Sequence, residues 1–359
     1  MATKSYTVLG LMSGTSLDGL DMAICRFDWD ASRWHYQILA AQTDSLPHTL
    51  VSRIQHAKKS RALDLMSLHA HLGQFIGASA RNFLQNSGFS CDFVCSHGQT
   101  IFHQPEFGVT TQIGDPAYIA ALTELPVVAD FRSVDIALGG NGAPLVPVGD
   151  ALLFPSYDAC VNLGGFANLS YPQPGNAEPS ARLAFDCCPF NTVANYFASQ
   201  LGKPFDASGH LGSSGQVITP LLERWNSLDF YQRTGPKSLG TEWLEEHFLS
   251  CVLEQWQPRD LLRTFYAHAA YQLGRAIPKT PGLRVLVTGG GAYNTFFIDQ
   301  LKAMHPALVF EIPDPKLIEF KEALIFAFLG VLRWRNEINV WKSVTGSSRS
   351  HSAGAIYHP

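Results

Sequence analysis

The sequence predicts an α/β protein built from two similar lobes. An apolar stripe of helical period over residues 62–86 precedes a short strand at 93–95, an order typical of layered α/β folds. The succession of strand, glycine-containing loop, strand and strand occurs near residue 6 and again near residue 159, although the residues themselves barely match. At 359 residues, 46% of them hydrophobic, the chain exceeds the usual size of one core and can fill two.

The first lobe is expected over residues 1–145, with the C-terminal segment 330–359 returning to it. Its long helix carries Leu65, Leu68, Leu72, Phe75 and Phe83 on one face, and Gly88 stands where a left-handed residue would end it. Apolar runs between turn-rich segments predict strands at 6–12, 21–27, 34–40 and 93–95.

The second lobe is expected over residues 155–325. Strands are predicted at 159–163, 168–171, 182–185, 284–288 and 309–312. One helix starts near Tyr293. Another, over 321–335, is apolar nearly all round, and its Ala323, Ala327 and Gly330 suit close packing. The tail 341–359 is polar and rich in Gly and Ser, which predicts a loop.

Charge and composition limit the classes of function. The formal net charge is −4 and no run of Lys or Arg suits a phosphate backbone or membrane surface, so neither a nucleic-acid nor a membrane partner is expected. No signal-peptide pattern and no apolar stretch of spanning length occurs, which predicts a cytoplasmic protein. Seven cysteines without framework spacing indicate reduced, buried thiols. The sequence leaves the oligomeric state open, a homodimer included.

Three glycine-bearing loops follow predicted strands, where α/β proteins commonly bind ligands. At such loops bare backbone N–H groups can approach a phosphate. The spacing fits neither the Walker motif nor the dinucleotide fingerprint, and each loop alone also suits an ordinary turn. Asp18 and Asp21 in the first loop are candidate oxygen ligands for Mg²⁺. The candidate phosphate-binding residues are Gly14, Thr15, Ser16, Leu17, Asp18, Gly19, Leu20 and Asp21, then Gly164 and Gly165, then Gly289, Gly290, Gly291 and Asn294.

Several further short segments accompany these loops in a fixed order. They are Ser96-His97-Gly98-Gln99-Thr100, Gln112-Ile113-Gly114-Asp115, Ala129-Asp130-Phe131-Arg132, Gly142-Ala143-Pro144-Leu145-Val146-Pro147 and Lys321-Glu322-Ala323. In this order and spacing the chain resembles the anhydro-N-acetylmuramic acid kinases, relatives of the actin, hexokinase and Hsp70 superfamily, over most of its length.

The resemblance implies two ribonuclease H-like lobes of the actin/hexokinase type with the active site between them. It also implies that ATP, with Mg²⁺, phosphorylates the 6-oxygen of 1,6-anhydro-N-acetylmuramic acid while water opens the anhydro bridge, a step of peptidoglycan recycling. The family's catalytic aspartate matches Asp186, a carboxylate that could take a proton from the attacking water. Arg132 and Glu322 match positions that contact the sugar, and His97 stands in a motif placed nearby.

The segment after Asp186 departs from the family pattern. Cys187-Cys188-Pro189-Phe190 stands where the family has Thr-Gly-Pro followed by Gly or Ala. This leaves two alternatives open: a non-catalytic relative that binds or senses muropeptides, and a kinase for a different sugar. Because Asp186 persists, we expect the Phe190 ring to turn into a local apolar pocket rather than narrow the sugar site.

Overall fold

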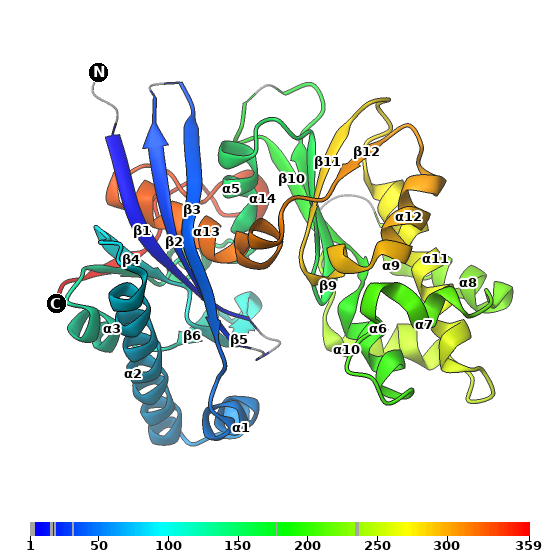
Figure 1. The fold of residues 1–359 in the computed structure, drawn as a ribbon, viewed down its shortest axis with the longest axis horizontal. Helices are drawn as coiled ribbons and strands as arrows, with labels where there is room; N and C mark the ends of the chain where they lie inside the picture. The colour runs from blue at the N-terminus through cyan, green and yellow to red at the C-terminus, as the bar shows by residue number, and fades with distance from the viewer. Residues whose placement is uncertain (1–3, 15–16, 18, 31, 177, 234–236) are drawn as a thin grey trace. The chain divides into compact units, whose positions relative to one another are not determined.

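The computed structural model describes residues 4–14, 17, 19–30, 32–176, 178–233 and 237–359 (Figure 1). The chain forms two compact units, Met1–Phe154 with Phe320–Pro359, and Pro155–Glu319. We call these unit 1 and unit 2. Helix α13 (Pro315–Trp334) begins in unit 2 and continues in unit 1, so unit 2 ends at Glu319 and not at residue 325 as expected from the sequence.

The sheet of unit 1 combines antiparallel and parallel strands in the order β13-β7-β4-β1-β2-β3. β1 pairs antiparallel with β2, and β2 with β3, whereas β1 pairs parallel with β4, and β4 with β7. A separate hairpin joins β5 (Gln99–Gln104) to β6 (Val109–Ile113). The six sheet strands are β1 (Lys4–Ser13), β2 (Leu20–Trp29), β3 (Trp34–Asp44), β4 (Phe93–Ser96), β7 (Val127–Ala129) and β13 (Ala355–Tyr357).

Unit 2 repeats this topology with the order β10-β9-β8-β11-β12. β8 pairs antiparallel with β9, and β9 with β10, whereas β8 pairs parallel with β11, and β11 with β12. The strands are β8 (Ala159–Leu163), β9 (Phe166–Pro172), β10 (Arg182–Pro189), β11 (Arg284–Thr288) and β12 (Val309–Glu311). Three antiparallel strands followed by two parallel ones, in the same order in both units, confirm the predicted pair of ribonuclease H-like lobes.

Helices cover both faces of the unit 1 sheet. Side chains of α1 (His48–His56), α2 (Ala62–Ser87) and α3 (Pro116–Thr123) share an apolar cluster with Leu9, Leu11 and Val94. On the opposite face α13 packs closely, because a Cβ added to Gly10 would collide with the backbone of Ala323. The predicted small-residue stripe of α13 is therefore confirmed as a packing surface. The remaining helices of the unit are α4 (Ser133–Ala137), α5 (Val146–Leu153) and α14 (Lys342–Thr345).

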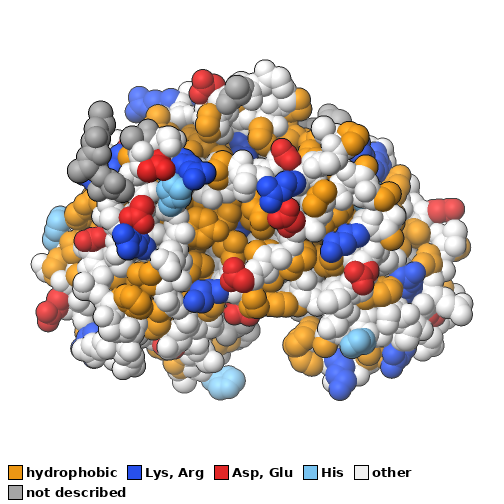
Figure 2. Space-filling view, turned by 45° about the horizontal axis from the view of Figure 1, so that its top comes forward, with side chains coloured by type: hydrophobic (Ala, Val, Ile, Leu, Met, Phe, Trp, Pro, Cys, Tyr) orange, Lys and Arg blue, Asp and Glu red, His pale blue; other side chains and the backbone are white. Residues whose placement is uncertain are grey.

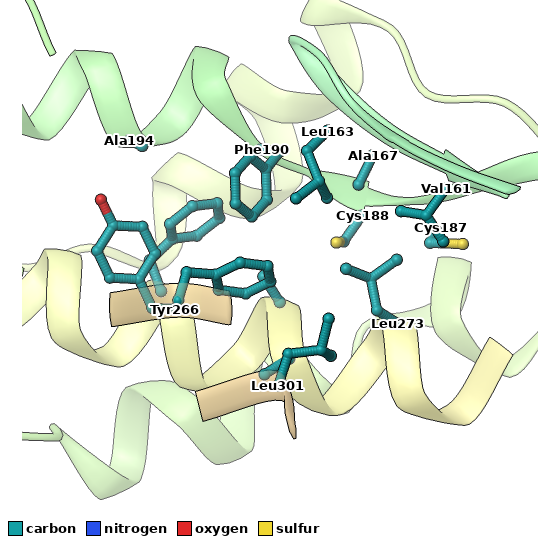
Figure 3. Packing of buried hydrophobic residues seen from close by; sticks show 14 of the residues in the cluster. Val161, Leu163, Ala167, Cys187, Cys188, Phe190, Ala194, Tyr266, Leu273 and Leu301 are labelled. Atoms are coloured by element: carbon teal, nitrogen blue, oxygen red, sulfur yellow. The ribbon is translucent and has the colours of Figure 1, made fainter. Parts of the chain in front are cut away.

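An aromatic core fills unit 2 (Figure 3). Trp225 stacks on Phe248 with ring centroids 4.4 Å apart, and helix α11 contributes the buried Phe265 and Tyr266. The helices are α6 (Asn191–Ser199), α7 (His210–Ser213), α8 (Thr219–Asn226), α9 (Asp229–Gln232), α10 (Thr241–Trp243), α11 (Pro258–Ala276) and α12 (Thr295–Met304).

The tail differs from its prediction as a loop. It contains α14 and the edge strand β13, whose Ile356 pairs with Val128 of β7. A strand of three residues carries too little alternation to be recognised in a sequence, and it forms because β7 offers an unpaired edge. The tail therefore completes the unit 1 sheet.

Acidic and basic side chains are interspersed over the face shown in Figure 2. None of the helices in the described parts of the chain combines the length and the apolar character needed to cross a bilayer.

Candidate functional site

The first glycine loop joins β1 to β2. Of its predicted residues, Thr15, Ser16 and Asp18 lie outside the described residues. The Leu17 N–H donates to the Gly14 carbonyl at 3.2 Å, and Leu17 has a positive φ of 58°. A Cβ on Gly19 would stand 2.6 Å from Thr43 Cγ2, so only glycine fits between the loop and β3. The described residues Gly14, Leu17 and Gly19 therefore follow the carboxyl end of β1 and precede β2.

Asp21, a predicted metal ligand, is the second residue of β2 and lies opposite Met12 of β1. Its Oδ1 accepts a hydrogen bond from the Thr43 hydroxyl at 2.6 Å, which fixes the carboxylate on the strand. In the described part of the chain no three His, Cys, Asp or Glu side chains gather closely enough to hold a metal by themselves. Mg²⁺ commonly uses only one or two carboxylates, with waters and phosphate oxygens completing its shell, and Asp21 fits that donor set.

The sugar-contact candidates of unit 1 form one cluster. Arg132 donates through Nε and Nη2 to His97 Nε2, at 3.0 and 2.9 Å, and through Nη1 to the Gly142 carbonyl at 2.6 Å. Burial, and then the neighbouring guanidinium, lowers the pKa of His97 to about 3, so the ring is neutral. Its Nδ1 therefore carries the proton and donates to the Gly98 carbonyl at 2.9 Å. Burial lowers the pKa of Arg132 to about 10, and the nearby Glu322 carboxylate opposes that shift.

A residue that the sequence did not single out supports this cluster. Asp135 is fully buried, and its Oδ2 accepts from the Gly142 N–H at 2.7 Å while its Oδ1 accepts from the Thr345 hydroxyl at 2.7 Å. Gly142 in turn accepts from Arg132. The polar tail thus anchors the loop that orients Arg132. The sequence pointed to this region only through the glycine-rich stretch 139–144, and nothing in that stretch indicated that Asp135 would support Arg132.

The other two glycine loops meet at one edge of the unit 2 sheet. β8 and β11 run parallel with Asn162 opposite Thr288, so the turn at Gly164 and Gly165 and the turn at 289–291 follow neighbouring strand ends. The start of α6 closes over the first turn, where the Phe190 N–H donates to the Gly165 carbonyl at 2.8 Å. Gly289 has φ +79°, and a Cβ there would collide with Asn162. Asn294 caps α12 by accepting from the Phe297 N–H at 2.9 Å.

Asp186, the predicted catalytic residue, lies on β10 opposite Asn168 of β9. A β-bulge follows it, between Asp186 and Cys188. Burial raises its pKa from 3.8 to about 6, and the Leu239 N–H, which donates to Oδ2 at 2.8 Å, opposes the shift. A carboxylate with a pKa near neutrality holds a proton weakly enough to release it and strongly enough to take it from water. No motif in the sequence had pointed to Leu239 as a partner of Asp186.

The Phe190 ring turns into an apolar pocket, as expected from the sequence. Its side chain is 1% exposed and packs edge-on against Phe297, with ring centroids 4.6 Å apart, and against Phe265 at 6.1 Å. Figure 3 shows it beside Leu163 and Cys188 within the apolar cluster. A Cβ on Gly291 would collide with this ring, so the unusual Phe is accommodated by a glycine of the third loop.

The predicted residues divide between the units. Unit 1 holds the first loop with His97, Arg132 and Glu322, and unit 2 holds Asp186 with the other two loops. Within unit 1, β1, β4 and β7 are parallel neighbours, so the first loop, His97 and Asp130 follow strand ends at one edge of the sheet.

The chain is similar to known proteins over nearly its whole length. A family model described as anhydro-N-acetylmuramic acid kinase matches residues 6–359. Curated proteins of that name are similar throughout: one from Shewanella amazonensis is 34% identical over 97% of this chain and 98% of its own, and one from Gloeobacter violaceus is 34% identical over 98% of each. Among solved structures, component A of (R)-2-hydroxyglutaryl-CoA dehydratase from Acidaminococcus fermentans aligns at 11% identity with a TM-score of 0.45, covering 90% of this chain and 96% of its own.

Proposed function

Because the chain belongs to the anhydro-N-acetylmuramic acid kinase family, of the actin/hexokinase fold type, we propose that Asp186 is the base of its reaction. The chain is an ATP-dependent kinase that converts 1,6-anhydro-N-acetylmuramic acid and water to N-acetylmuramic acid 6-phosphate, with release of ADP, in peptidoglycan recycling. The observation that carries the proposal is the Asp186 carboxyl group, whose pKa is raised to about 6 by burial.

The proposed reaction needs only one base, Asp186. Asp186 takes a proton from water as the water oxygen bonds to the anomeric carbon, and the bond between that carbon and O6 breaks. The electron pair left on O6 attacks the γ-phosphorus of ATP, and the bond from phosphorus to the bridging oxygen of ADP breaks. Asp186 then returns its proton to solvent. The Leu239 N–H holds the carboxylate oxygen in place through these steps.

The glycine loops are assigned to the nucleotide. The loops would present backbone groups to the phosphates and the adenosine. The residues assigned this role are Gly14, Thr15, Ser16 and Gly19 of the first loop, Gly164 and Gly165 of the second, and the run 289–291 of the third. Asp21, with Asp18, would hold Mg²⁺, which when bound neutralises charge on the β- and γ-phosphate oxygens.

The sugar is assigned to the cluster of Arg132, His97 and Glu322. The substrate is an acid, and the partly buried guanidinium of Arg132 supplies a positive charge, held in place by His97 and Gly142, for its carboxylate. His97, kept neutral, orients that guanidinium by accepting from it.

Mass spectrometry of the product tests the proposal. The chain is incubated with 1,6-anhydro-N-acetylmuramic acid and Mg-ATP in ¹⁸O-water, and we expect a 6-phosphorylated sugar with the label on the anomeric oxygen. A phosphorylated sugar that still contains the anhydro bridge, or one without label, would refute the role of water. ATP binding with no sugar product would instead favour a non-catalytic muropeptide-binding protein.

A further inference from the structure

The turn formed by residues 206–213 packs against the third glycine loop, residues 289–294. The hydroxyl group of Thr295, the first residue of α12, donates to the Ser208 carbonyl at 3.3 Å. A Cβ added to Gly209 would collide with the side chain of Asn294. Ser208 and Gly209 both have a positive φ, of 55° and 76°, and strain of this kind in a residue other than glycine is concentrated at functional sites. The strained turn therefore supports the loop that carries Asn294.

The carboxylate of Asp206 holds this turn in place. Asp206 is 7% exposed, and its Oδ1 accepts from the Leu211 N–H at 2.7 Å. Its Oδ2 accepts from the Gly212 N–H at 2.9 Å and from the Tyr266 hydroxyl at 3.0 Å. A Cβ on Gly212 would collide with the Tyr266 ring, so the turn lies in close contact with α11. One buried carboxylate therefore joins the turn 206–213 to α11.

Tyr266 extends this connection to Asn294 of the glycine loop. Its side chain is fully buried in the apolar core, with the hydroxyl oxygen at the edge of the cluster drawn in Figure 3. Burial and the Asp206 carboxylate raise the pKa of Tyr266, and a hydrogen bond with the Asn294 side chain opposes that rise. Because the phenol donates its own proton to Asp206, it accepts this second bond, and the Asn294 amide nitrogen is the donor.

Asp206 gives this series of hydrogen bonds a single direction. A carboxylate can only accept, so Tyr266 donates to Asp206 and is left to accept from Asn294. The Asn294 Oδ1 is then free to accept from the Phe297 N–H at 2.9 Å and cap α12. With a group at position 206 that can also donate, the phenol could donate to the Asn294 oxygen and compete with the Phe297 N–H. Asp206 therefore selects the orientation of the Asn294 amide.

We propose that Asp206 is a positioning residue for the nucleotide: acting through Tyr266, it holds Asn294 and the third glycine loop in the conformation that receives the nucleotide. The inference rests on the proposed function, which assigns that loop to the nucleotide. All three side chains belong to unit 2, whereas the residues assigned to the sugar, Arg132 among them, belong to unit 1. A change at Asp206 should therefore affect the affinity for the nucleotide and leave the affinity for the sugar alone.

Two substitutions and a matched control test the proposal. Asp206→Asn keeps the shape of the side chain but adds a donor, and Tyr266→Phe removes the hydroxyl but keeps the ring. Tyr231→Phe is the control, because Tyr231 is also buried in unit 2 and its hydroxyl bonds to His268 at 2.9 Å, away from the loop. Calorimetry gives the dissociation constants for adenylyl imidodiphosphate with Mg²⁺ and, separately, for 1,6-anhydro-N-acetylmuramic acid, and the thermal midpoint reports stability.

We expect Asp206→Asn and Tyr266→Phe to bind the nucleotide analogue about 5- to 10-fold more weakly than the wild type, with sugar affinity within twofold. The control should lower the thermal midpoint and bind the analogue as the wild type does. If Asp206 acts through Tyr266, the double variant should bind the analogue no more than twofold more weakly than Tyr266→Phe alone. Should Asp206→Asn fail to fold, the comparison of Tyr266→Phe with Tyr231→Phe decides by itself.

Two results would overturn the proposal. Nucleotide affinity within twofold of the wild type in Tyr266→Phe, or losses that add fully in the double variant, would leave Asp206 as a cap of its own turn only. Both affinities are measured without turnover. A wild type that binds the analogue but forms no phosphorylated sugar would therefore contradict the proposed function alone.

Discussion

Replacing Asp186 by Asn should slow catalysis strongly and at the same time stabilise the folded protein. In the folded chain burial raises the pKa of this carboxyl group from 3.8 to about 6, so ionised Asp186 is disfavoured in the folded state. Above pH 6 the ionised carboxylate therefore lowers the free energy of unfolding. Below pH 3.8 the group is protonated in both the folded and the unfolded state, and its ionisation no longer affects stability. A change in pKa from 3.8 to about 6 corresponds to at most about 3 kcal/mol.

The variant removes this cost because an amide does not ionise. The Asn oxygen can still accept from the Leu239 N–H, so the local hydrogen bond is kept. We expect the free energy of unfolding of Asp186→Asn to exceed that of the wild type by up to about 3 kcal/mol at pH 8, with the excess vanishing near pH 3.5. We expect kcat to fall by at least about 10²-fold, because the base is lost.

Urea titrations from pH 3.5 to 8, with steady-state kinetics, measure both quantities. Leu239→Ala is the control, since it retains the N–H that bonds to Asp186. The wild-type kcat should rise with pH and level off above about 6, where the base is ionised. A loss of kcat smaller than threefold would refute the catalytic role of Asp186. The stability argument would be refuted if the difference in unfolding free energy between Asp186→Asn and the wild type were no larger at pH 8 than at pH 3.5.

Three further substitutions have defined outcomes. Phe190→Gly should lower the free energy of unfolding by roughly 3 kcal/mol or more, because the ring is 1% exposed, while the sugar KM stays within a few-fold; a tenfold lower KM at an unchanged midpoint would contradict this. Gly289→Ala should raise the KM for ATP and cost more than about 1 kcal/mol of stability, since φ is +79° and the new Cβ would collide with Asn162; unchanged ATP titrations would argue against it. Thr345→Val removes the hydroxyl that donates to the buried Asp135 carboxylate, so the free energy of unfolding, measured by heat or urea, should fall by about 1–3 kcal/mol. Thr345→Ser keeps a hydroxyl and should have nearly the stability of the wild type.

Elements with strong local patterns could be predicted from the sequence. The helix expected at 62–86 is α2, Ala62–Ser87, and Gly88 ends it with φ +72°. The strands expected at 159–163 and 284–288 are β8 and β11 with the same bounds. Continuous apolar runs bounded by glycine are local signals, and they need no knowledge of the rest of the chain.

Elements that depend on a distant partner were predicted poorly. The strand expected at 182–185 extends to Pro189 as β10, because β9 continues to pair with it beyond a bulge. The helix expected from residue 321 begins at Pro315. β13 was missed altogether, since its only support is the edge of β7, more than 200 residues earlier in the chain.

The sequence by itself determined the architecture, the family and the identity of the candidate residues, because these follow from local periodicity and from short segments in a fixed order. Only the tertiary structure decided the state of those residues. Burial sets the pKa of Asp186, a contact with Arg132 fixes the tautomer of His97, and Phe297 and Phe265 receive the ring of Phe190. Each of these depends on desolvation or packing by residues far away in the chain, and a linear pattern does not encode that proximity.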